Sequence, residues 1–470
     1  MAFDSAAFLF FFLPLLLIIE ALIRPVRAKN VFLCLAGLLF YSFGELWALA
    51  LLIASALVNW ALGLLAMRGS RAAVPLAAVI NLALLGVCKY LGFFGSGLAL
   101  IGVELSLPEI AAPAGVSFFT FKGISYVADA AKRPEDGTKS FFEALFYISF
   151  LPEVMSGPLS RFSAFRAQLS ARRRSLELTA RGARRFLLGL SKKLLLSGAA
   201  AIAADAAFSA GDALTAPLAW LGAVGYSLQL YFDFSGYSDM AAGLGAMLGF
   251  KCPENFNYPY AAVSITDFWR RWHISLSLWF RDYLYIPLGG SRRGKWRTAA
   301  NKAAVFVLCG LWHGANMTFV LWGAWHALLS ALESLKVLDT ERWRRTAAGR
   351  VFSRFYTLLC VCLGFVMFRA PDVASGFEYL AAMFTGWDFS AAAELLLART
   401  ADGYVLLMTA LCAAASLPVL PSLRRRLSSP DGALRPAADT AGYAASLLLL
   451  IICAAALASG GFAPFIYFQF

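Results

Sequence analysis

Two of the three histidines in this chain are candidates for chemistry, and one of them, His313, interrupts apolar sequence, where burying a polar side chain is costly. His313 lies in Leu311-Trp-His-Gly-Ala-Asn316, and the apolar run before it, Ala303 to Leu311, is short. This pattern predicts a helical hairpin that dips into a membrane and returns, with Gly314 permitting close approach of backbone or ligand. A neutral imidazole at that depth can take the proton of a hydroxyl as a general base. Backbone N–H groups or the Asn316 amide could hold the oxyanion of a tetrahedral intermediate, and together these steps are acyl transfer.

His273 lies in a second polar stretch, Ser264 to Ser277. Ser264 and Asp267 have capping-box spacing, which predicts that a helix begins here. Asp267 and Arg271 are i, i+4 partners on such a helix, and Arg270 lies with His273 on a neighbouring strip. Two interpretations stay open: an interfacial helix with its own salt bridge, or an anion-recognising wall beside a cofactor.

Plainer interpretations apply to the histidines as well. The His313 imidazole could simply form its hydrogen bonds with a neighbouring helix. His326 would lie about 220° around a continuous helix from His313, so we interpret His326 as structural. The sequence has no GxSxG, HExxH or Walker motif. Two histidines without a carboxylate nearby in sequence make a metal site a weak hypothesis, and we expect no metal. The eight cysteines form no CxxC pair, so no disulfide framework is indicated.

Composition then places these residues in a membrane protein. Hydrophobic residues make up 60% of the 470 residues, charged residues only 15%, and the mean hydropathy is +0.68. Basic residues bunch between apolar runs, as the positive-inside rule predicts for cytoplasmic loops, so the net charge of +13 is not evidence for nucleic acid. With every bunch inside, both termini lie outside and roughly a dozen helices cross the bilayer.

Two segments do not fit the pattern of simple spans and loops. Phe141 to Pro158 is apolar but lies between two basic loops, which predicts a re-entrant or interfacial segment. Arg161 to Lys193 carries ten basic residues against one acidic residue. This composition favours a helix lying on anionic headgroups, with an anionic-substrate site as the alternative.

Several long motifs resemble one known family. The chain is similar to membrane-bound O-acyltransferases, the MBOAT family, and most of all to the branch that O-acetylates alginate, with strong similarity from about 110 to 335. The motifs that carry the resemblance are Tyr231 to Met240, Pro253 to Tyr260, Ser264 to Ser277, Arg281 to Gly290 and Gly310 to Ala315, with supporting matches at Ala114 to Phe121, Ser156 to Pro158 and Phe465 to Phe470.

The resemblance implies a fold and roles for individual residues. The fold is all-α, a single domain over 1–470 with transmembrane, re-entrant and interfacial helices around a central tunnel. His313 matches the catalytic histidine and His273 the second motif histidine. Our candidate substrate- and donor-binding residues are Asp267, Arg270, Arg271, Trp272, Trp312 and Asn316. Lys122 and Glu153 depart from the family pattern, which has glutamine at both positions, and they could compensate each other.

The implied function is acyl transfer across a bacterial cytoplasmic (inner) membrane. The donor is acetyl-CoA or an acyl-carrier thioester, and no cofactor stays bound. The acceptor is an extracytoplasmic polysaccharide, reached through a partner acyltransferase. Two alternatives remain open: a transporter or flippase that uses the same helices without covalent chemistry, and an envelope scaffold in which the histidines are structural.

Overall fold

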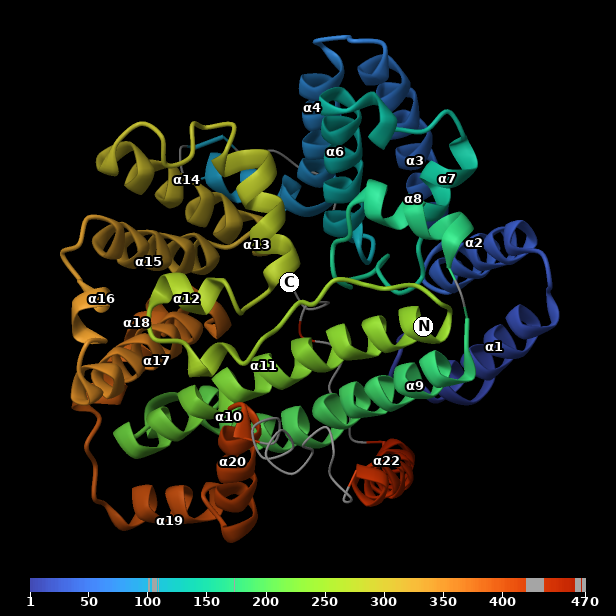
Figure 1. Ribbon diagram of the computed structural model, residues 1–470. Coiled ribbons are helices and arrows are strands. Elements are labelled where there is room, and N and C mark those ends of the chain that lie inside the picture. The colour runs from blue at the N-terminus through green and yellow to red at the C-terminus, as the bar shows by residue number, and fades with distance from the viewer. Residues whose placement is uncertain are drawn as a thin grey trace. The chain divides into compact units, whose positions relative to one another are not determined.

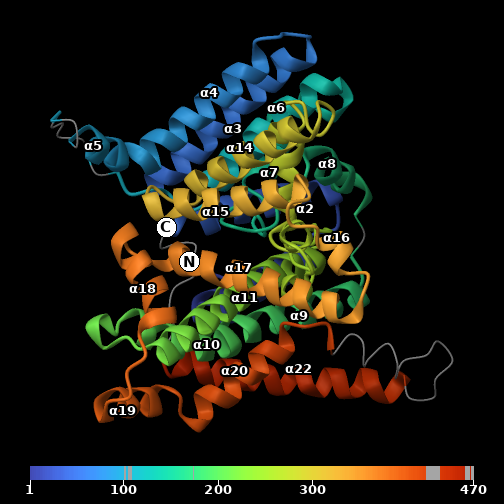
Figure 2. The same cartoon turned by 90° about the vertical axis from the view of Figure 1, so that its left-hand side faces the viewer.

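The computed structural model describes residues 1–99, 102–103, 108, 110–172, 174–419, 435–460 and 466, and most of the terminal Phe465 to Phe470 motif lies outside these residues. All regular structure in these residues is helical, as expected (Figures 1 and 2). The described chain forms two compact units, one of Met1–Phe186 with Tyr237–Glu254 and one of Leu187–Gly236 with Asn255–Phe470.

Close helix packing through small residues organises the first unit. Its helices are α1 (Leu13–Leu22), α2 (Val26–Ser42), α3 (Leu46–Met67), α4 (Ala73–Leu85), α5 (Leu91–Ala99), α6 (Val116–Lys132), α7 (Phe141–Ile148), α8 (Phe162–Ala171) and most of α9 (Leu176–Ser191). A Cβ on Gly63 would lie 2.5 Å from the Tyr126 ring, so α3 and α6 approach closely only because this residue is glycine. Asn59 of α3 and Asn81 of α4 exchange amide hydrogen bonds of 3.2 and 2.8 Å.

A buried ion pair in the same unit joins α6 to the segment after α7. Lys122 Nζ lies 2.8 Å from Glu153 Oε2, and both side chains are 1% exposed. Ser160 Oγ donates to the same carboxylate oxygen at 2.7 Å, and the ammonium lies 4.3 Å from the centre of the Tyr147 ring. Lys122 and Glu153, which we expect to depart from the family pattern, therefore pair with each other directly.

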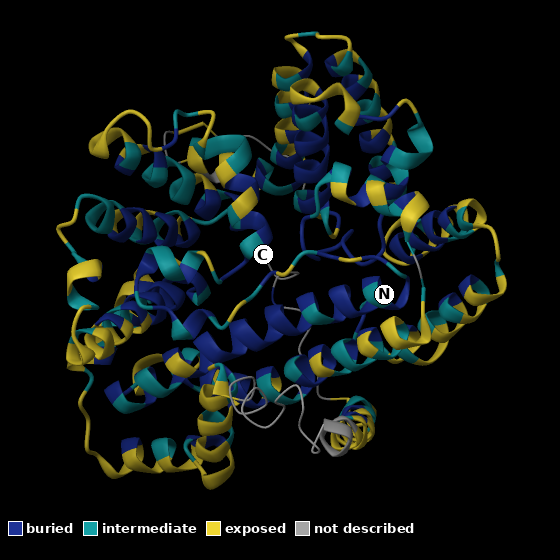
Figure 3. Cartoon of the chain, viewed as in Figure 1, coloured by how far each residue is buried: buried dark blue, intermediate teal, exposed yellow. Residues whose placement is uncertain are grey.

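The second unit contains the long helix α11 (Ala216–Met247), which runs on into the first unit and is buried along most of its length (Figure 3). The other helices of this unit are α10 (Gly198–Phe208), α12 (Ile265–Trp269), α13 (Ile274–Phe280), α14 (Lys295–His313), α15 (Met317–Ser334), α16 (Thr340–Trp343), α17 (Ala347–Arg369), α18 (Val373–Thr385), α19 (Ala391–Thr400), α20 (Gly403–Ala415) and α22 (Arg435–Ala458). Its apolar core joins α10, α11, α17 and α18 through residues such as Ala219, Val366 and Met383.

Fewer helices qualify as membrane spans than the roughly dozen we expected from the basic loops. Five helices of the described chain are long and apolar enough, or six if α19 and α20, bent by 57°, count as one span. The five are α3 (Leu46–Met67), the continuous run of α4 and α5 (Ala73–Ala99), the continuous run of α9 and α10 (Leu176–Phe208), α17 (Ala347–Arg369) and most of α22 (Thr440–Ala458). The difference arises because several apolar runs fold as short helices, or, as in α14, share a helix with basic residues.

The segment from Phe141 to Pro158 contains only the eight-residue helix α7. A helix of this length extends about 12 Å, far less than the ~30 Å of a bilayer core, so it does not cross. The chain then turns back through buried residues from Ser149 to Pro158. Ser140 caps its start by accepting from Glu143 N at 3.4 Å. The segment is thus too short to span a bilayer as a helix, and its re-entrant or interfacial position stays a prediction.

Candidate functional site

His313 lies at the last position of α14, directly before the turn into α15. The two helices pack closely in a hairpin because each has a glycine at the contact. A Cβ on Gly310 would lie 2.3 Å from Phe319 O, and a Cβ on Gly323 would lie 2.5 Å from Phe306 O, so neither position has room for a side chain. The His313 side chain is buried. Its ring centre lies 5.2 Å from that of Trp322 and 5.2 Å from that of Phe368, so aromatic packing fixes the imidazole.

His273 lies between two short helices instead of within one. Ser264 caps α12, with Oγ accepting from Asp267 N at 2.9 Å, whereas Asp267 Oδ2 accepts from Val263 N at 3.2 Å, and α12 ends at Trp269. His273 then has φ +44°, in the left-handed region that non-glycine residues seldom adopt, and α13 begins at Ile274. The helix predicted from the spacing is therefore interrupted at the histidine. Backbone strain of this kind is concentrated at functional sites.

Both histidines line one largely apolar chamber of about 250 Å³. Aromatic and aliphatic side chains from α12, α13 and α14 form most of its wall, including Trp269, Trp272, Leu276, Phe280, Val305 and Phe306. Besides the two histidines, the lining includes the polar residues Thr266, Arg270, Ser277, Arg281, Tyr285, Lys302 and Ser330. An apolar wall of this kind lowers the local dielectric, which strengthens the electrostatic interactions made beside it.

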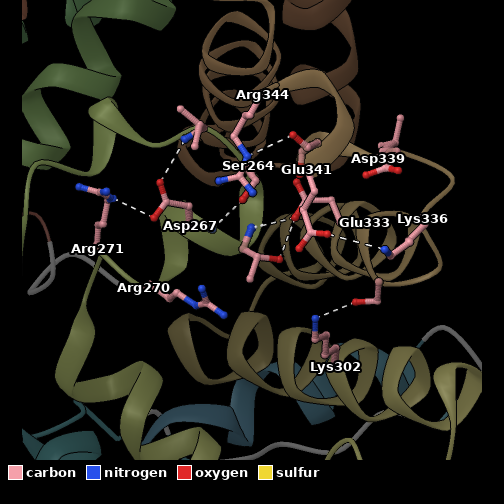
Figure 4. Close-up of a pocket in the computed structure, with 15 residues that line it drawn as sticks. Ser264, Asp267, Arg270, Arg271, Lys302, Glu333, Lys336, Asp339, Glu341 and Arg344 are labelled. Carbon is pink, nitrogen blue, oxygen red and sulfur yellow. Dashed lines mark hydrogen bonds and ion pairs between the residues drawn. The ribbon is translucent and has the colours of Figure 1, made fainter. Parts of the chain in front are cut away.

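A polar pocket of about 450 Å³ shares residues with this chamber. Thr266, Arg270 and Lys302 line both cavities, so these three side chains mark where the cavities meet. Figure 4 shows the remaining charged residues around the pocket, which come from α12, from the end of α15 and from α16 and its flanks: Asp267, Arg271, Glu333, Lys336, Asp339, Glu341 and Arg344. A polar entrance thus adjoins an apolar chamber that contains two histidines.

Arg270 and Arg271 have different surroundings. Arg271 Nε donates to Asp267 Oδ1 at 3.0 Å, which is the predicted i, i+4 pair, and the guanidinium also reaches Asn257 O at 3.4 Å. Arg270 is exposed and makes no hydrogen bond or ion pair within the described part of the chain. Of the two arginines, Arg270 is therefore the one whose donors are available to a ligand.

Glu333, at the end of α15, holds α12 in place. Its carboxylate accepts from Ile265 N at 2.7 Å, from Thr266 N at 3.0 Å and from Thr266 Oγ1 at 2.8 Å. A carboxylate is favourable at the start of a helix, where the N–H groups have no partner within the helix. This clamp ties the element that leads to His273 to the hairpin that carries His313.

The structure brings most of the predicted site residues to these cavities. His273, His313, Trp272 and Arg270 line the chamber, and Asp267 and Arg271 line the polar pocket. Trp312 does not line either cavity, but its ring centre lies 4.9 Å from that of His313 and 6.5 Å from that of His273.

Asn316 has a different place from the one we predicted. It caps α15, with Oδ1 accepting from Thr318 N at 3.1 Å and Nδ2 donating to Pro371 O at 2.7 Å. The amide is therefore committed to the turn, and Asn316 does not line either cavity.

The sequence reasoning missed Glu333, Lys302 and Asn255. Glu333 is an acidic residue at the end of an apolar run, which is a local signal, but its partners lie 67 and 68 residues away. Asn255 Oδ1 lies 3.1 Å from His273 Nδ1, and Asn255 lies within the Pro253 to Tyr260 motif. Among the described residues, no group of three or more His, Cys, Asp or Glu side chains has the arrangement of a metal site.

Comparisons with known proteins show the family of this chain. The model of the MBOAT, membrane-bound O-acyltransferase family, matches residues 98–370. The probable alginate O-acetylase AlgI of Azotobacter vinelandii is 36% identical over 100% of both chains. The peptidoglycan O-acetyltransferase of Helicobacter pylori is 32% identical over 81% of this chain and 79% of its own. The teichoic acid D-alanyltransferase of Bacillus subtilis is 30% identical over 54% and 68%, respectively.

The resemblance that we inferred from the motifs is thus confirmed over more than the histidine segments alone. The matched region includes both histidines, both cavities and the Glu333 clamp. This chain is a multi-pass membrane O-acyltransferase that belongs to the membrane-bound O-acyltransferase family.

Proposed function

We propose that this enzyme takes an acetyl group from a cytoplasmic thioester and passes it across the membrane, with His313 as the general base. The observation that carries the proposal is a pair of adjoining cavities. A polar pocket and an apolar chamber lined by His273 and His313 share the side chains of Thr266, Arg270 and Lys302.

The donor class follows from the chemistry of the two cavities. Acetyl-CoA and an acyl-carrier protein both present a thioester on an arm that carries phosphate. The Arg270 guanidinium, which has no partner in the described chain, offers the forked donors that bind phosphate well. The apolar chamber suits the acyl end of the thioester, because apolar side chains such as Leu276, Phe280 and Val305 line it. We propose no bound cofactor and no metal.

The transfer itself needs one base and one leaving group. The acceptor hydroxyl oxygen attacks the thioester carbonyl carbon, and its proton passes to the His313 imidazole. A new carbon–oxygen bond forms, the carbon–sulfur bond breaks, and the thiolate takes the proton back from the imidazolium. The products are an ester and a free thiol, so atoms and charge balance.

The acceptor is proposed from the relatives. Their names describe an alginate O-acetylase and a peptidoglycan O-acetyltransferase, both of which point to polysaccharide hydroxyls. We propose that this enzyme lies in a bacterial inner membrane, with roughly a dozen crossing helices around a tunnel. An extracytoplasmic polysaccharide would be the final acceptor, reached through a partner acyltransferase on the outer side.

Replacing His313 tests this function. His313→Ala should reduce the ester-linked acetyl content of extracellular polysaccharide by about 10²-fold or more, because it removes the base, while membrane expression stays normal. His326→Phe is the matched control, since His326 is buried, packs against the rings of Trp269 and Trp322, and does not line the chamber. We expect that variant to keep acetylation.

The outcomes separate acyl transfer from the two alternatives, a transporter and an envelope scaffold. Acetylation above about a tenth of the wild-type level in His313→Ala would contradict the assignment of the base. Polymer or lipid movement that is unchanged in that variant, without any acetylation in the wild type, would favour a transporter. Full function without either His273 or His313 would favour a scaffold.

A further inference from the structure

Asn255 holds the strained turn that carries His273. Its backbone carbonyl accepts from Ile274 N at 2.9 Å, and two residues further on Asn257 N donates to Arg271 O at 2.9 Å. These bonds fasten the segment before α12 to the turn between α12 and α13. His273 keeps its left-handed backbone, with φ +44°, inside this frame. Backbone hydrogen bonds on both sides of His273 therefore fix the position from which its imidazole extends.

The side chain of Asn255 is oriented by a donor that cannot reverse its role. Its Oδ1 position lies 3.2 Å from Ser275 N and 2.9 Å from Ser275 Oγ. A backbone N–H can only donate, so the atom facing it must be the amide oxygen and not the amide nitrogen. The orientation of the amide thus follows from the hydrogen bonds and does not depend on distinguishing oxygen from nitrogen.

The same oxygen lies 3.1 Å from His273 Nδ1. An amide oxygen cannot donate, so the hydrogen of this bond must belong to Nδ1. Burial also lowers the pKa of His273 to about 3, which keeps the ring neutral at neutral pH. A neutral imidazole with a proton on Nδ1 carries a lone pair on Nε2.

We infer that Asn255 is a positioning residue that fixes His273 as the Nδ1–H tautomer, so that His273 presents a hydrogen-bond acceptor at Nε2. This inference deepens the proposed function, and its mechanistic meaning rests on that function. His273 can accept a hydrogen bond from a hydroxyl, a water or a protonated His313. It cannot donate to a thioester oxyanion or to a donor phosphate, so those groups depend on other donors.

The tautomer can be read directly by ¹⁵N NMR of protein labelled at histidine. The chain has only three histidines, and comparison with His273→Gln identifies the signals of His273. A protonated and an unprotonated ring nitrogen have well-separated shifts. Wild-type protein should show Nδ1 protonated and Nε2 unprotonated. A protonated Nε2 in the wild type would overturn the inference, whatever the activity.

Three variants show whether Asn255 is the cause. Asn255→Asp keeps an acceptor for the Nδ1 hydrogen, so Nδ1 should stay protonated, while the added negative charge favours protonation of Nε2 as well. Asn255→Leu removes the acceptor, which should mix the tautomers and lower acetylation by at least about tenfold, because a wrong tautomer disables a catalytic histidine. Ser275→Ala removes a neighbouring hydrogen bond but leaves the acceptor, so the tautomer should not change.

The outcomes of the inference and of the proposed function are distinguishable. An unchanged tautomer in a folded Asn255→Leu protein would show that Asn255 does not set it. If Asn255→Leu fails to fold, the wild-type spectrum and the Asn255→Asp spectrum still decide the matter. A correct tautomer together with an active His313→Ala variant would leave the inference intact and would contradict the proposed function instead.

Discussion

Two charged regions of this molecule differ in how completely their charges are paired. In the first unit, the Lys122–Glu153 pair is 1% exposed on both sides, and Ser160 and Tyr147 complete its surroundings. In the second unit, Arg270 is exposed at the point where two cavities meet and has no hydrogen-bond or ion-pair partner in the described chain. One region satisfies its charges internally, and the other keeps a cation open.

This difference separates structural charge from functional charge. A buried ion pair contributes little net stability relative to apolar residues, but breaking it leaves a charge without compensation. An open arginine contributes little to folding, and its donors can bind a ligand phosphate. Substitutions in the first region should therefore change stability, whereas substitutions in the second should change use of the donor.

The largest expected effect is on stability and comes from breaking the buried pair. Lys122→Gln or Glu153→Gln alone should destabilise the protein by about 3–5 kcal/mol, because each leaves the other charge buried and unpaired. The double variant, which carries glutamine at both positions, should recover most of this loss. The measurement is the fraction of detergent-purified protein that stays monodisperse after heating.

Single variants as stable as the wild type would contradict a structural role for the Lys122–Glu153 pair. A double variant no more stable than the single variants would also contradict it, since that result would assign another role to one of the two residues. Acetylation per folded molecule serves as the control here. It should be close to the wild-type level in the double variant, because the pair belongs to the first unit and the two cavities to the second.

The second effect concerns Arg270 and appears in donor use. Arg270→Lys keeps the charge but loses the fork, and we expect apparent donor affinity to weaken about tenfold, the equivalent of one charged hydrogen bond. Thermal stability should not change. The measurement is the dependence of acyl transfer on acetyl-CoA concentration in proteoliposomes. An unchanged apparent affinity would show that Arg270 does not contact the donor.

The sequence predicted the features of the site that are local in the chain. The Ser264 cap of α12, the Asp267–Arg271 pair and the hairpin around Gly314 each involve residues a few positions apart, and the structure contains all three. It did not predict Glu333 as the clamp of α12, because only tertiary packing brings together residues 68 positions apart.

The hairpin also removes the premise of the helical-wheel argument for His326, although His326 does not line the chamber and its structural role stays a prediction. That wheel places His326 about 220° from His313 on a continuous helix. The helix breaks at Gly314, and α15 returns alongside α14. The rings of His313 and His326 consequently lie on the same tryptophan, with centres 5.2 and 5.1 Å from that of Trp322. A helical wheel holds only while the helix is unbroken.

The smallest expected effect concerns Arg271, which adjoins Arg270 but is paired with Asp267 at 3.0 Å. Both side chains are partly exposed, and such i, i+4 pairs are typically worth about 0.3–0.5 kcal/mol. Arg271→Lys retains the charge and can retain the pair, so both stability and apparent donor affinity should stay within about twofold of the wild type. The measurement is the same donor titration as for Arg270→Lys, made side by side. Equal weakening in both variants would mean that the donor displaces Asp267 from Arg271 and that the two arginines bind it together. Weakening in Arg271→Lys alone would reverse the assignment and make the paired arginine the ligand.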